Sequence, residues 1–325
     1  MKEIPSKLMQ FVSGYRASRI VLTAIELDLF SQIGTGATAS QITGEIRADE
    51  RGTAVLLHAL TALGLLRKKG GRFFNTPVSA GFLAAGGAND GRLGLKHHLA
   101  LWESWSALTK VVREGSPGER SMGGMTEEAR TAAFIGLMHQ TGAIRGPRVA
   151  AALRTLPGTR MLDVGGGSGA YSIAILRKNR RLRATLFDRS VVLPLAQRYV
   201  AKAGFSDRFT FQAGDLTTDR LGEGFDLVLI SSICHMLSPE QNVNLFERAR
   251  RALVEGGTIV VHDFILENDR TKPVQAALFA VNMLVNTEGG NSYSVADYTS
   301  WLRSAGFGKI RFRRLPGGSD LMTAS

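Results

Sequence analysis

The chain has 325 residues, of which 44% are hydrophobic and 21% charged, a composition typical of a globular protein of about two domains. No apolar run reaches the roughly 18–20 residues that a membrane-spanning helix needs, and the first residues lack the apolar segment of a signal peptide. The single cysteine, Cys234, excludes an intrachain disulfide and a zinc site of the cysteine type. We therefore expect a cytoplasmic protein with no membrane partner and no bound metal ion.

The net charge of +12 raises the question of a nucleic-acid partner. The basic residues are spread along the chain and form only small clusters, at Arg67–Lys69, Arg180–Arg183 and Arg311–Arg314. Clusters of this size are typical of solvated loops and strand ends. Because the basic residues are spread in this way, we expect no nucleic-acid partner.

Helical patterns dominate the first part of the chain. Residues 8–30 carry apolar side chains at spacings of three and four, which predicts one helix with an apolar stripe long enough to cover a partner as well. Short helical patterns follow, with Thr38 and Asp49 as plausible N-caps. Two short strands turning at Gly70-Gly71 complete the pattern of a winged-helix domain.

Short apolar strands alternate with helices from Thr159 onward, which predicts an α/β domain with a doubly wound parallel sheet covered on both faces. We expect three parts: a winged helix over 1–90, a helical region over 91–157 and the sheet domain over 158–325. The predicted strands are Arg160–Val164, Ala184–Phe187, Phe209–Ala213, Phe225–Ile230, Thr258–Phe264 and Lys309–Arg313.

A glycine-rich loop joins the first of these strands to the next helix, in the sequence Met161-Leu-Asp-Val-Gly-Gly-Gly-Ser-Gly-Ala170. Glycines at 165, 167 and 169 let a ligand approach the backbone without meeting a Cβ atom. Gly165, Gly167 and Ala170 also satisfy the dinucleotide pattern, so the loop alone fits a nicotinamide enzyme as well as a methyltransferase.

Acidic residues near the loop favour the second interpretation. Asp163 lies two residues before Gly165, and Asp188 ends the second strand, where a carboxylate can accept both ribose hydroxyls. Gly214-Asp215-Leu216 follows the third strand and offers a carboxylate to an adenine amino group and an apolar side chain to its ring. A dehydrogenase has no need of that third acidic position, whereas an adenosyl sulfonium ligand uses it.

From about Tyr15 to Phe307 the chain resembles the S-adenosylmethionine-dependent O-methyltransferases of the caffeate, hydroxyindole and bacterial polyketide type. The resemblance implies a Rossmann-like class I methyltransferase fold, an N-terminal winged-helix dimerisation domain, a homodimer and a small-molecule acceptor. It also implies that S-adenosylmethionine, with S-adenosylhomocysteine as product, is held by residues at the strand ends, namely Asp163, Gly165, Gly167, Gly169, Asp188, Gly214, Asp215, Leu216 and Ser231.

A histidine follows the fourth strand, in Ser231-Ser-Ile-Cys-His235, and an imidazole there can remove a proton near neutral pH. The resemblance places the family's catalytic base on His235, within a segment similar to its Cys-His-Asp-Trp stretch. Asp263, at the end of the fifth strand, matches the acidic residue that orients this base. Ser292 stands where plant members have a second acidic residue, so activation of the base rests on Asp263.

The acceptor pocket is predicted from fewer residues. Asn282 and Asn286 lie four apart around Met283 on one predicted helix, where family members place acceptor contacts. Trp105, Met138 and His139 are further candidates from the helical middle region. His262, next to Asp263, is expected to pack on the opposite face of its strand, because side chains alternate along a strand.

Two alternatives stay open at this point. A relative of the family could bind the same cofactor and methylate carbon or nitrogen, or perform a different reaction. The +12 charge also suggests a winged-helix, ligand-responsive DNA-binding protein. Against this second alternative, the helix that would read DNA begins Asp49-Glu-Arg and is apolar beyond, whereas a groove-reading helix needs outward basic and polar side chains.

Overall fold

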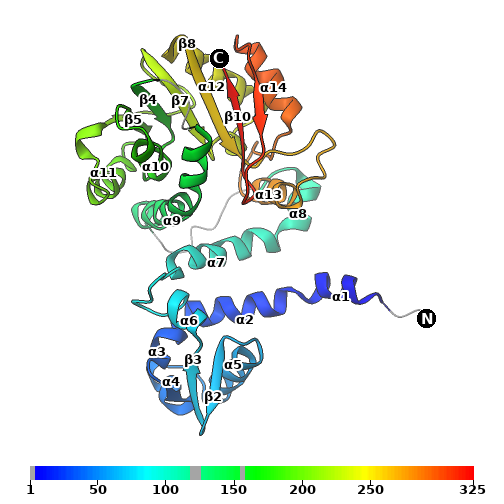
Figure 1. Ribbon diagram of the computed structural model, residues 1–325. Coiled ribbons are helices and arrows are strands. Elements are labelled where there is room, and N and C mark those ends of the chain that lie inside the picture. The colour runs from blue at the N-terminus through cyan, green and yellow to red at the C-terminus, as the bar shows by residue number, and fades with distance from the viewer. Residues whose placement is uncertain (1–3, 118–125, 154–157) are drawn as a thin grey trace. The chain divides into compact units, whose positions relative to one another are not determined.

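The structure, a computed structural model, describes residues 4–117, 126–153 and 158–325. The chain forms two compact units, one up to Glu103 and one from Ser104 onward (Figure 1). Within the described residues no helix is both long and apolar enough to cross a membrane. The three-part division over 1–90, 91–157 and 158–325 stays a prediction.

The N-terminal unit has the expected helices followed by a hairpin (Figure 1). Thr38 and Asp49 are confirmed as N-caps, since their side chains accept hydrogen bonds from the amides of Gln41 and Gly52. A short additional strand pairs antiparallel with the hairpin. The elements are α1 (Ser6–Ser13), α2 (Tyr15–Glu26), α3 (Leu29–Ile33), β1 (Ala37–Thr38), α4 (Ala39–Ile46), α5 (Glu50–Ala62), β2 (Leu66–Lys69), β3 (Arg72–Asn75), α6 (Pro77–Phe82) and α7 (Arg92–Ser106). The last residues of α7, from Ser104, belong to the C-terminal unit.

The single helix predicted over residues 8–30 is wrong. Two helices, α1 and α2, cover residues 6–26 with Gly14 between them. Helix α2 ends at Glu26, and Asp28 adopts a positive φ of 49°, which turns the chain before α3. The apolar stripe therefore serves two surfaces: Leu29 lies in the core of the unit, whereas Phe11 and Tyr15 are 74% and 56% exposed. Periodicity alone could not separate these two roles, because both halves keep helical spacing.

The C-terminal unit is built on a seven-stranded sheet of order β6-β5-β4-β7-β8-β10-β9. The first five strands are parallel, as predicted, and β10 pairs antiparallel with β8 and β9. The elements are α8 (Leu108–Glu114), α9 (Glu127–Leu153), β4 (Arg160–Val164), α10 (Ala170–Lys178), β5 (Arg183–Asp188), α11 (Leu193–Lys202), η1 (Ser206–Arg208), β6 (Phe209–Ala213), β7 (Phe225–Ser231), η2 (Cys234–Met236), α12 (Pro239–Ala252), β8 (Leu253–Asp263), α13 (Val274–Leu284), α14 (Val295–Ser304), β9 (Arg311–Arg313) and β10 (Asp320–Ala324).

The sheet therefore differs from the prediction at one edge. The predicted strand Lys309–Arg313 is shorter, and β10 was missed altogether. Leu321 and Met322 of β10 are buried, one in each of two cores, because β10 lies inside the sheet rather than at its edge. A five-residue strand that follows a Gly-Gly turn carries too short a pattern to be recognised from the sequence.

Two hydrophobic cores cover the two faces of the sheet, and side-chain alternation along each strand divides residues between them. On β4, Met161 packs with residues of α9, α10 and α11, whereas Leu162 packs with residues of α12 and α14 (Figure 1). On β7, Leu229 and Ile230 divide in the same way. The strands are thus held from both sides, and their carboxyl ends meet at one edge.

Helices α9 and α10 approach one another closely at two glycines. A Cβ atom built on Gly142 would lie 2.7 Å from the Cβ of Ala170, and one built on Gly146 would lie 2.9 Å from the Cβ of Ala174. Both separations are shorter than real Cβ contacts, so these positions require glycine in this arrangement. Since the glycine-rich loop leads directly into α10, this contact fixes α9 relative to the loop.

Candidate functional site

The glycine-rich loop lies between β4 and α10. Gly165 and Gly167 have positive φ values of 65° and 56°, and a Cβ atom on Gly165 would lie 2.4 Å from Ile233. The amide of Gly165 donates to the carbonyl of Phe187 at 2.8 Å, and the amide of Gly167 donates to Oδ2 of Asp188 at 2.8 Å. The loop is thus bonded to the end of β5, where Asp188 was predicted to bind a ligand.

Two carboxylates follow β5 and β6. Asp188 is half-buried; burial raises its pKa, although amides of Gly167 and Arg189 bond to it. Asp215 is exposed, and its Oδ1 accepts both the hydroxyl and the amide of Thr217, which hold its pKa below the ordinary value. Within the described residues the Oδ2 atom of Asp215 has no protein partner, so it is available to a donor such as an amino group.

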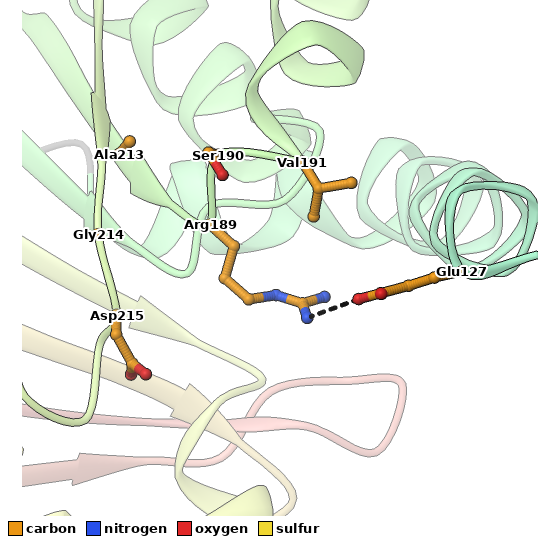
Figure 2. A pocket seen from close by; sticks show the side chains of 7 residues that line it. All are labelled: Glu127, Arg189, Ser190, Val191, Ala213, Gly214 and Asp215. Carbon is orange, nitrogen blue, oxygen red and sulfur yellow. Dashed lines mark ion pairs between the residues drawn. The ribbon is translucent and has the colours of Figure 1, made fainter.

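A cavity of about 500 Å³ opens beside these carboxylates (Figure 2). This volume lies within the usual range for small-molecule sites. Figure 2 shows Arg189 reaching toward Glu127 of α9, with which it forms an ion pair at 4.0 Å. The lining residues are Glu127, Arg189, Ser190, Val191, Ala213, Gly214 and Asp215.

Only Gly214 and Asp215 of this lining were predicted. Arg189 directly follows Asp188 in the sequence, and that adjacency was a signal that could have identified it. Leu216 is the residue after Asp215 in the sequence and is half-buried. A Cβ atom built on Gly165 would lie 3.5 Å from its side chain, so Leu216 approaches the glycine loop.

Asp163 lies beneath the loop. It is 2% exposed and accepts a hydrogen bond from the hydroxyl of Ser172 on α10. Burial raises its pKa to about 7; the Ser172 bond opposes the shift and the charge of Asp188 adds to it. Asp163 therefore joins β4 to α10 and supports the loop from below. Gly169, the N-cap of α10, is also buried.

Ser231, at the end of β7, belongs to a polar network that the sequence did not reveal. Its Oγ lies 2.8 Å from Nδ1 of His262, and Nε2 of His262 lies 2.8 Å from Oγ of Ser319. Burial lowers the pKa of His262 to about 4, so the imidazole is neutral at neutral pH. His262 is buried as predicted, yet both of its ring nitrogens also have partners.

His235 and Asp263 form a buried polar pair after β7 and at the end of β8. His235 is 7% exposed, and its Nδ1 lies 2.6 Å from Oδ1 of the fully buried Asp263. The amides of His235 and Phe264 donate to the same carboxylate at 3.1 and 2.8 Å, and the Tyr298 hydroxyl donates at 3.4 Å.

These contacts and burial act in opposite directions on the pKa of Asp263. Burial raises the pKa of Asp263, but the charge of His235 and its hydrogen bond, with the Phe264 amide, outweigh burial and lower it overall. An ionised Asp263 accepts the proton of Nδ1, which leaves Nε2 of His235 as the nitrogen able to receive a proton.

Two aromatic rings contact the imidazole of His235. Phe279 of α13 meets the imidazole edge-on at 4.9 Å and 89°, and Phe264 stacks on Phe279 at 4.1 Å and 28°. Ser292 is buried, and its hydroxyl has no hydrogen-bond partner in the described chain. Among the described residues Asp263 is the only carboxylate bonded to His235, as the replacement by Ser292 led us to expect.

Three of the predicted acceptor residues form a hydrogen-bonded chain. Nε1 of Trp105 donates to Oδ1 of Asn282 at 3.2 Å, and Nδ2 of Asn286 donates to the carbonyl and Oδ1 of Asn282 at 2.8 and 3.0 Å. The prediction that both asparagines lie on one helix is wrong, because α13 ends at Leu284 and Asn286 follows it. Met283, which lies between the two asparagines in the sequence, is buried.

His139 and Met138 come from α9. The ring of His139 stacks on Tyr199 at 3.9 Å, and its Nδ1 lies 3.0 Å from the hydroxyl of Ser168 in the glycine loop. Burial, and to a lesser degree the charge of Lys202, lower the pKa of His139. His139 therefore contacts the glycine loop, whereas Met138 is half-buried beside it.

Comparison with known proteins gives two family matches. The sequence model of the O-methyltransferase domain matches residues 105–308, and that of the O-methyltransferase dimerisation domain matches residues 9–85. Together they account for most of the chain.

Individual relatives cover nearly the full length. The chain is 33% identical to 3-hydroxy-5-methyl-1-naphthoate 3-O-methyltransferase of Streptomyces sahachiroi, over 98% of this chain and 94% of that protein. It is 29% identical to L-tyrosine C(3)-methyltransferase of Streptomyces lavendulae, over 93% and 86%. The crystal structure of human N-acetylserotonin methyltransferase in complex with SAM is similar, with a TM-score of 0.85, 26% identity and coverage of 99% and 98%.

The raised pKa of Asp163 predicts an unusual pH dependence of stability. Between its ordinary pKa and about 7 the folded state holds a proton that the unfolded state has lost, so this group makes stability fall as pH rises. Asp163→Asn removes the buried charge. We expect the variant to melt about 2–8 °C above the parent at pH 8, with a gap that shrinks toward pH 5.

Asp226→Asn is the matched control, because amides of Thr159 and Arg160 bond to Asp226 and lower its pKa. It should melt below the parent at pH 8, and this loss should shrink only as pH falls through the lowered pKa. Thermal denaturation followed by circular dichroism measures both. An equal loss of melting temperature for Asp163→Asn at pH 5 and pH 8 contradicts the assignment.

Proposed function

Because this chain belongs to the S-adenosylmethionine-dependent O-methyltransferase family, with a dimerisation domain and a class I methyltransferase domain, we propose that it methylates a hydroxyl of a small aromatic or polyketide-like molecule with His235 as general base. The observation that supports this most directly is the 2.6 Å contact between His235 and the buried Asp263 at the carboxyl edge of the sheet.

The cofactor site fits S-adenosylmethionine, which supplies an electrophilic methyl group on a positively charged sulfur. Asp188 is proposed to accept the ribose hydroxyls, and the free Oδ2 of Asp215 to accept the adenine amino group. Leu216 would contact the adenine ring beside the cavity of about 500 Å³. The remaining contacts are assigned to backbone and side-chain atoms of Gly165, Gly167, Gly169, Gly214 and Ser231, with Asp163 supporting the loop.

In the proposed mechanism, Nε2 of His235 takes the proton of the acceptor hydroxyl. Asp263 keeps the other ring proton on Nδ1 and stabilises the imidazolium that forms. The amides of His235 and Phe264 and the hydroxyl of Tyr298 hold the carboxylate of Asp263 in place. The carboxylate in turn fixes the orientation of the His235 ring. S-adenosylmethionine, when bound, would supply the methyl group that the acceptor oxygen receives, and the residues of the chain would hold the two molecules in position for the transfer.

The relatives support an aromatic acceptor. One is named for a hydroxynaphthoate and one solved relative for N-acetylserotonin. In this chain Phe264 and Phe279 lie beside His235 and are half-buried, so an aromatic acceptor can pack against their exposed parts. Trp105, Asn282 and Asn286, with Met283 and Met138, are proposed as further acceptor contacts.

Methylation of carbon is the second candidate, since one relative is named as an L-tyrosine C(3)-methyltransferase. Deprotonation of a phenol also activates the neighbouring ring carbon, so the same base serves both outcomes. Nuclear magnetic resonance of the product distinguishes a methoxy carbon from a methyl carbon bonded to the ring.

We further propose a homodimer. The dimerisation domain match covers residues 9–85, and α1 carries exposed apolar side chains, of which Leu8 and Phe11 are 51% and 74% exposed. The three-part division of the chain and a cytoplasmic location are retained as proposals.

The first prediction of this assignment concerns the cofactor. Asp188→Ala should weaken S-adenosylhomocysteine binding by about 1.5–3 kcal/mol, because charge-assisted hydrogen bonds to the ribose are lost. Isothermal titration calorimetry measures the change. Asp207→Ala, which removes an exposed carboxylate elsewhere in the same unit, should bind as the parent does. Unchanged binding by Asp188→Ala would show that the ribose lies elsewhere.

The second prediction concerns the base. His235→Ala should lower turnover by about 10²–10⁴-fold with little change in S-adenosylhomocysteine affinity, because it removes only the proton acceptor. Asp263→Asn should lower turnover less than His235→Ala does, since it disturbs the orientation of the base without deleting it. Activity of His235→Ala should recover in part at high pH, where the hydroxyl ionises unaided. Near-normal turnover of this variant at neutral pH would exclude His235 as the base.

The third prediction concerns assembly. Light scattering at micromolar concentration should report twice the 35.1 kDa mass of one chain. Phe11→Glu should shift the protein toward monomer, because it places a charge on the exposed apolar face of α1. Val254→Glu, a similar change on the partly exposed Val254 of β8, should leave the dimer intact. A monomeric parent protein contradicts the proposal.

A further inference from the structure

We propose that Arg145 recognises an acidic group on the methyl acceptor, so that the acceptor is an aromatic hydroxy acid whose hydroxyl meets His235 while its carboxylate pairs with the guanidinium. This inference rests on the proposed role of His235. It adds a substrate class and a residue that selects it.

The contacts of Arg145 connect it to the catalytic pair through two rings. Its guanidinium carbon lies 5.5 Å from the centre of the Phe264 ring. Phe264 stacks on Phe279, and Phe279 meets His235 edge-on at 4.9 Å. Phe264 also directly follows Asp263, and its ring centre lies 6.3 Å from that of His235. Arg145 and His235 thus both contact the same pair of stacked rings.

Among the described residues no carboxylate forms an ion pair with Arg145. The Arg145 side chain is half-buried. Neighbouring Arg148, in contrast, is exposed and donates to the carbonyl of Pro316. A cation held against an apolar surface gains most from an anion that arrives with a ligand, because burial of an unpaired charge is unfavourable.

The position of Arg145 also points toward the reacting edge of the sheet. The charge of Arg145 adds to the effect of burial in lowering the pKa of His262 on β8. The same charge opposes the effect of burial on Tyr171, whose pKa burial raises. The guanidinium therefore lies near the carboxyl ends of the strands, where the acceptor must bind.

The backbone of Arg145 is held in place. Gly142 and Gly146 lie on either side of it along α9, and both are seated against α10. The helix cannot slide without a clash, so the guanidinium is presented from a fixed point by a flexible side chain. Its planar set of N–H donors matches a carboxylate in a bidentate arrangement.

The test uses two acids, 3-hydroxybenzoate and 3-hydroxy-2-naphthoate, and their carboxamides, which keep the phenol and lose the charge. The variants are Arg145→Met, Arg145→Lys and, as a matched control three residues along the same helix, Arg148→Met. Methyl transfer at saturating S-adenosylmethionine gives kcat/KM, and calorimetry gives S-adenosylhomocysteine affinity and binding of each acid to the S-adenosylhomocysteine-loaded protein.

We expect the parent to bind and methylate at least one acid better than its carboxamide. Arg145→Met should lower kcat/KM for that acid by about 10–100-fold and change the carboxamide by less than about threefold, because only the charged contact is lost. For the acid, kcat/KM of Arg145→Lys should lie between the values of the parent and of Arg145→Met. Arg148→Met should have the kcat/KM of the parent for both substrates. S-adenosylhomocysteine affinity should stay unchanged throughout.

Three results overturn the inference. Equal losses for acid and carboxamide would make Arg145 structural, and weaker S-adenosylhomocysteine binding would assign it to the cofactor carboxylate. A parent that neither binds nor methylates either acid, or that prefers the carboxamides, also excludes it. His235→Ala tests the proposed function separately from the role of Arg145. If the parent methylates a carboxamide and His235→Ala does not, the assignment of His235 as the base stands even though the selectivity for acids is excluded.

Discussion

The buried carboxylate of Asp263 is the constraint around which the site is organised. Removing a carboxylate from water is costly unless donors replace the lost hydration. Here the His235 ring and amide, the Phe264 amide and the Tyr298 hydroxyl supply those donors. They come from the segments that follow β7 and β8 and from α14, so one charge holds three parts of the chain together. Orientation of the His235 ring, the proposed base, and packing of the sheet edge are therefore the same requirement.

The parallel sheet extends this arrangement to the cofactor side. Because the carboxyl ends of β4 to β8 lie at one edge, Asp188, Asp215, Ser231 and Asp263 gather there although they are far apart in sequence. Their environments differ sharply: Asp263 is fully buried, Asp188 half-buried and Asp215 exposed. Burial thus distinguishes Asp263, proposed to orient the base, from Asp188 and Asp215, proposed to bind the cofactor.

Much of this arrangement follows from the sequence, and the exceptions have physical reasons. The glycine loop, the strand-end carboxylates and the pairing of His235 with Asp263 depend on local patterns and on strand order, which the sequence carries. The turn at Asp28, the end of α13 before Asn286 and the strand β10 depend on backbone geometry or on distant partners. The network of His262 with Ser231 and Ser319 joins residues that no spacing rule connects.

In the proposed acceptor site, α9 and α13 differ in how firmly they are packed against the rest of the unit. Glycines at 142 and 146 leave no side chain that could compress, so α9 keeps its place whatever binds beside it. Helix α13, in contrast, buries only Ala276 and Met283. Accommodation of larger or smaller acceptors during the divergence of such enzymes would then fall on α13, while α9, which carries Arg145, stays constant.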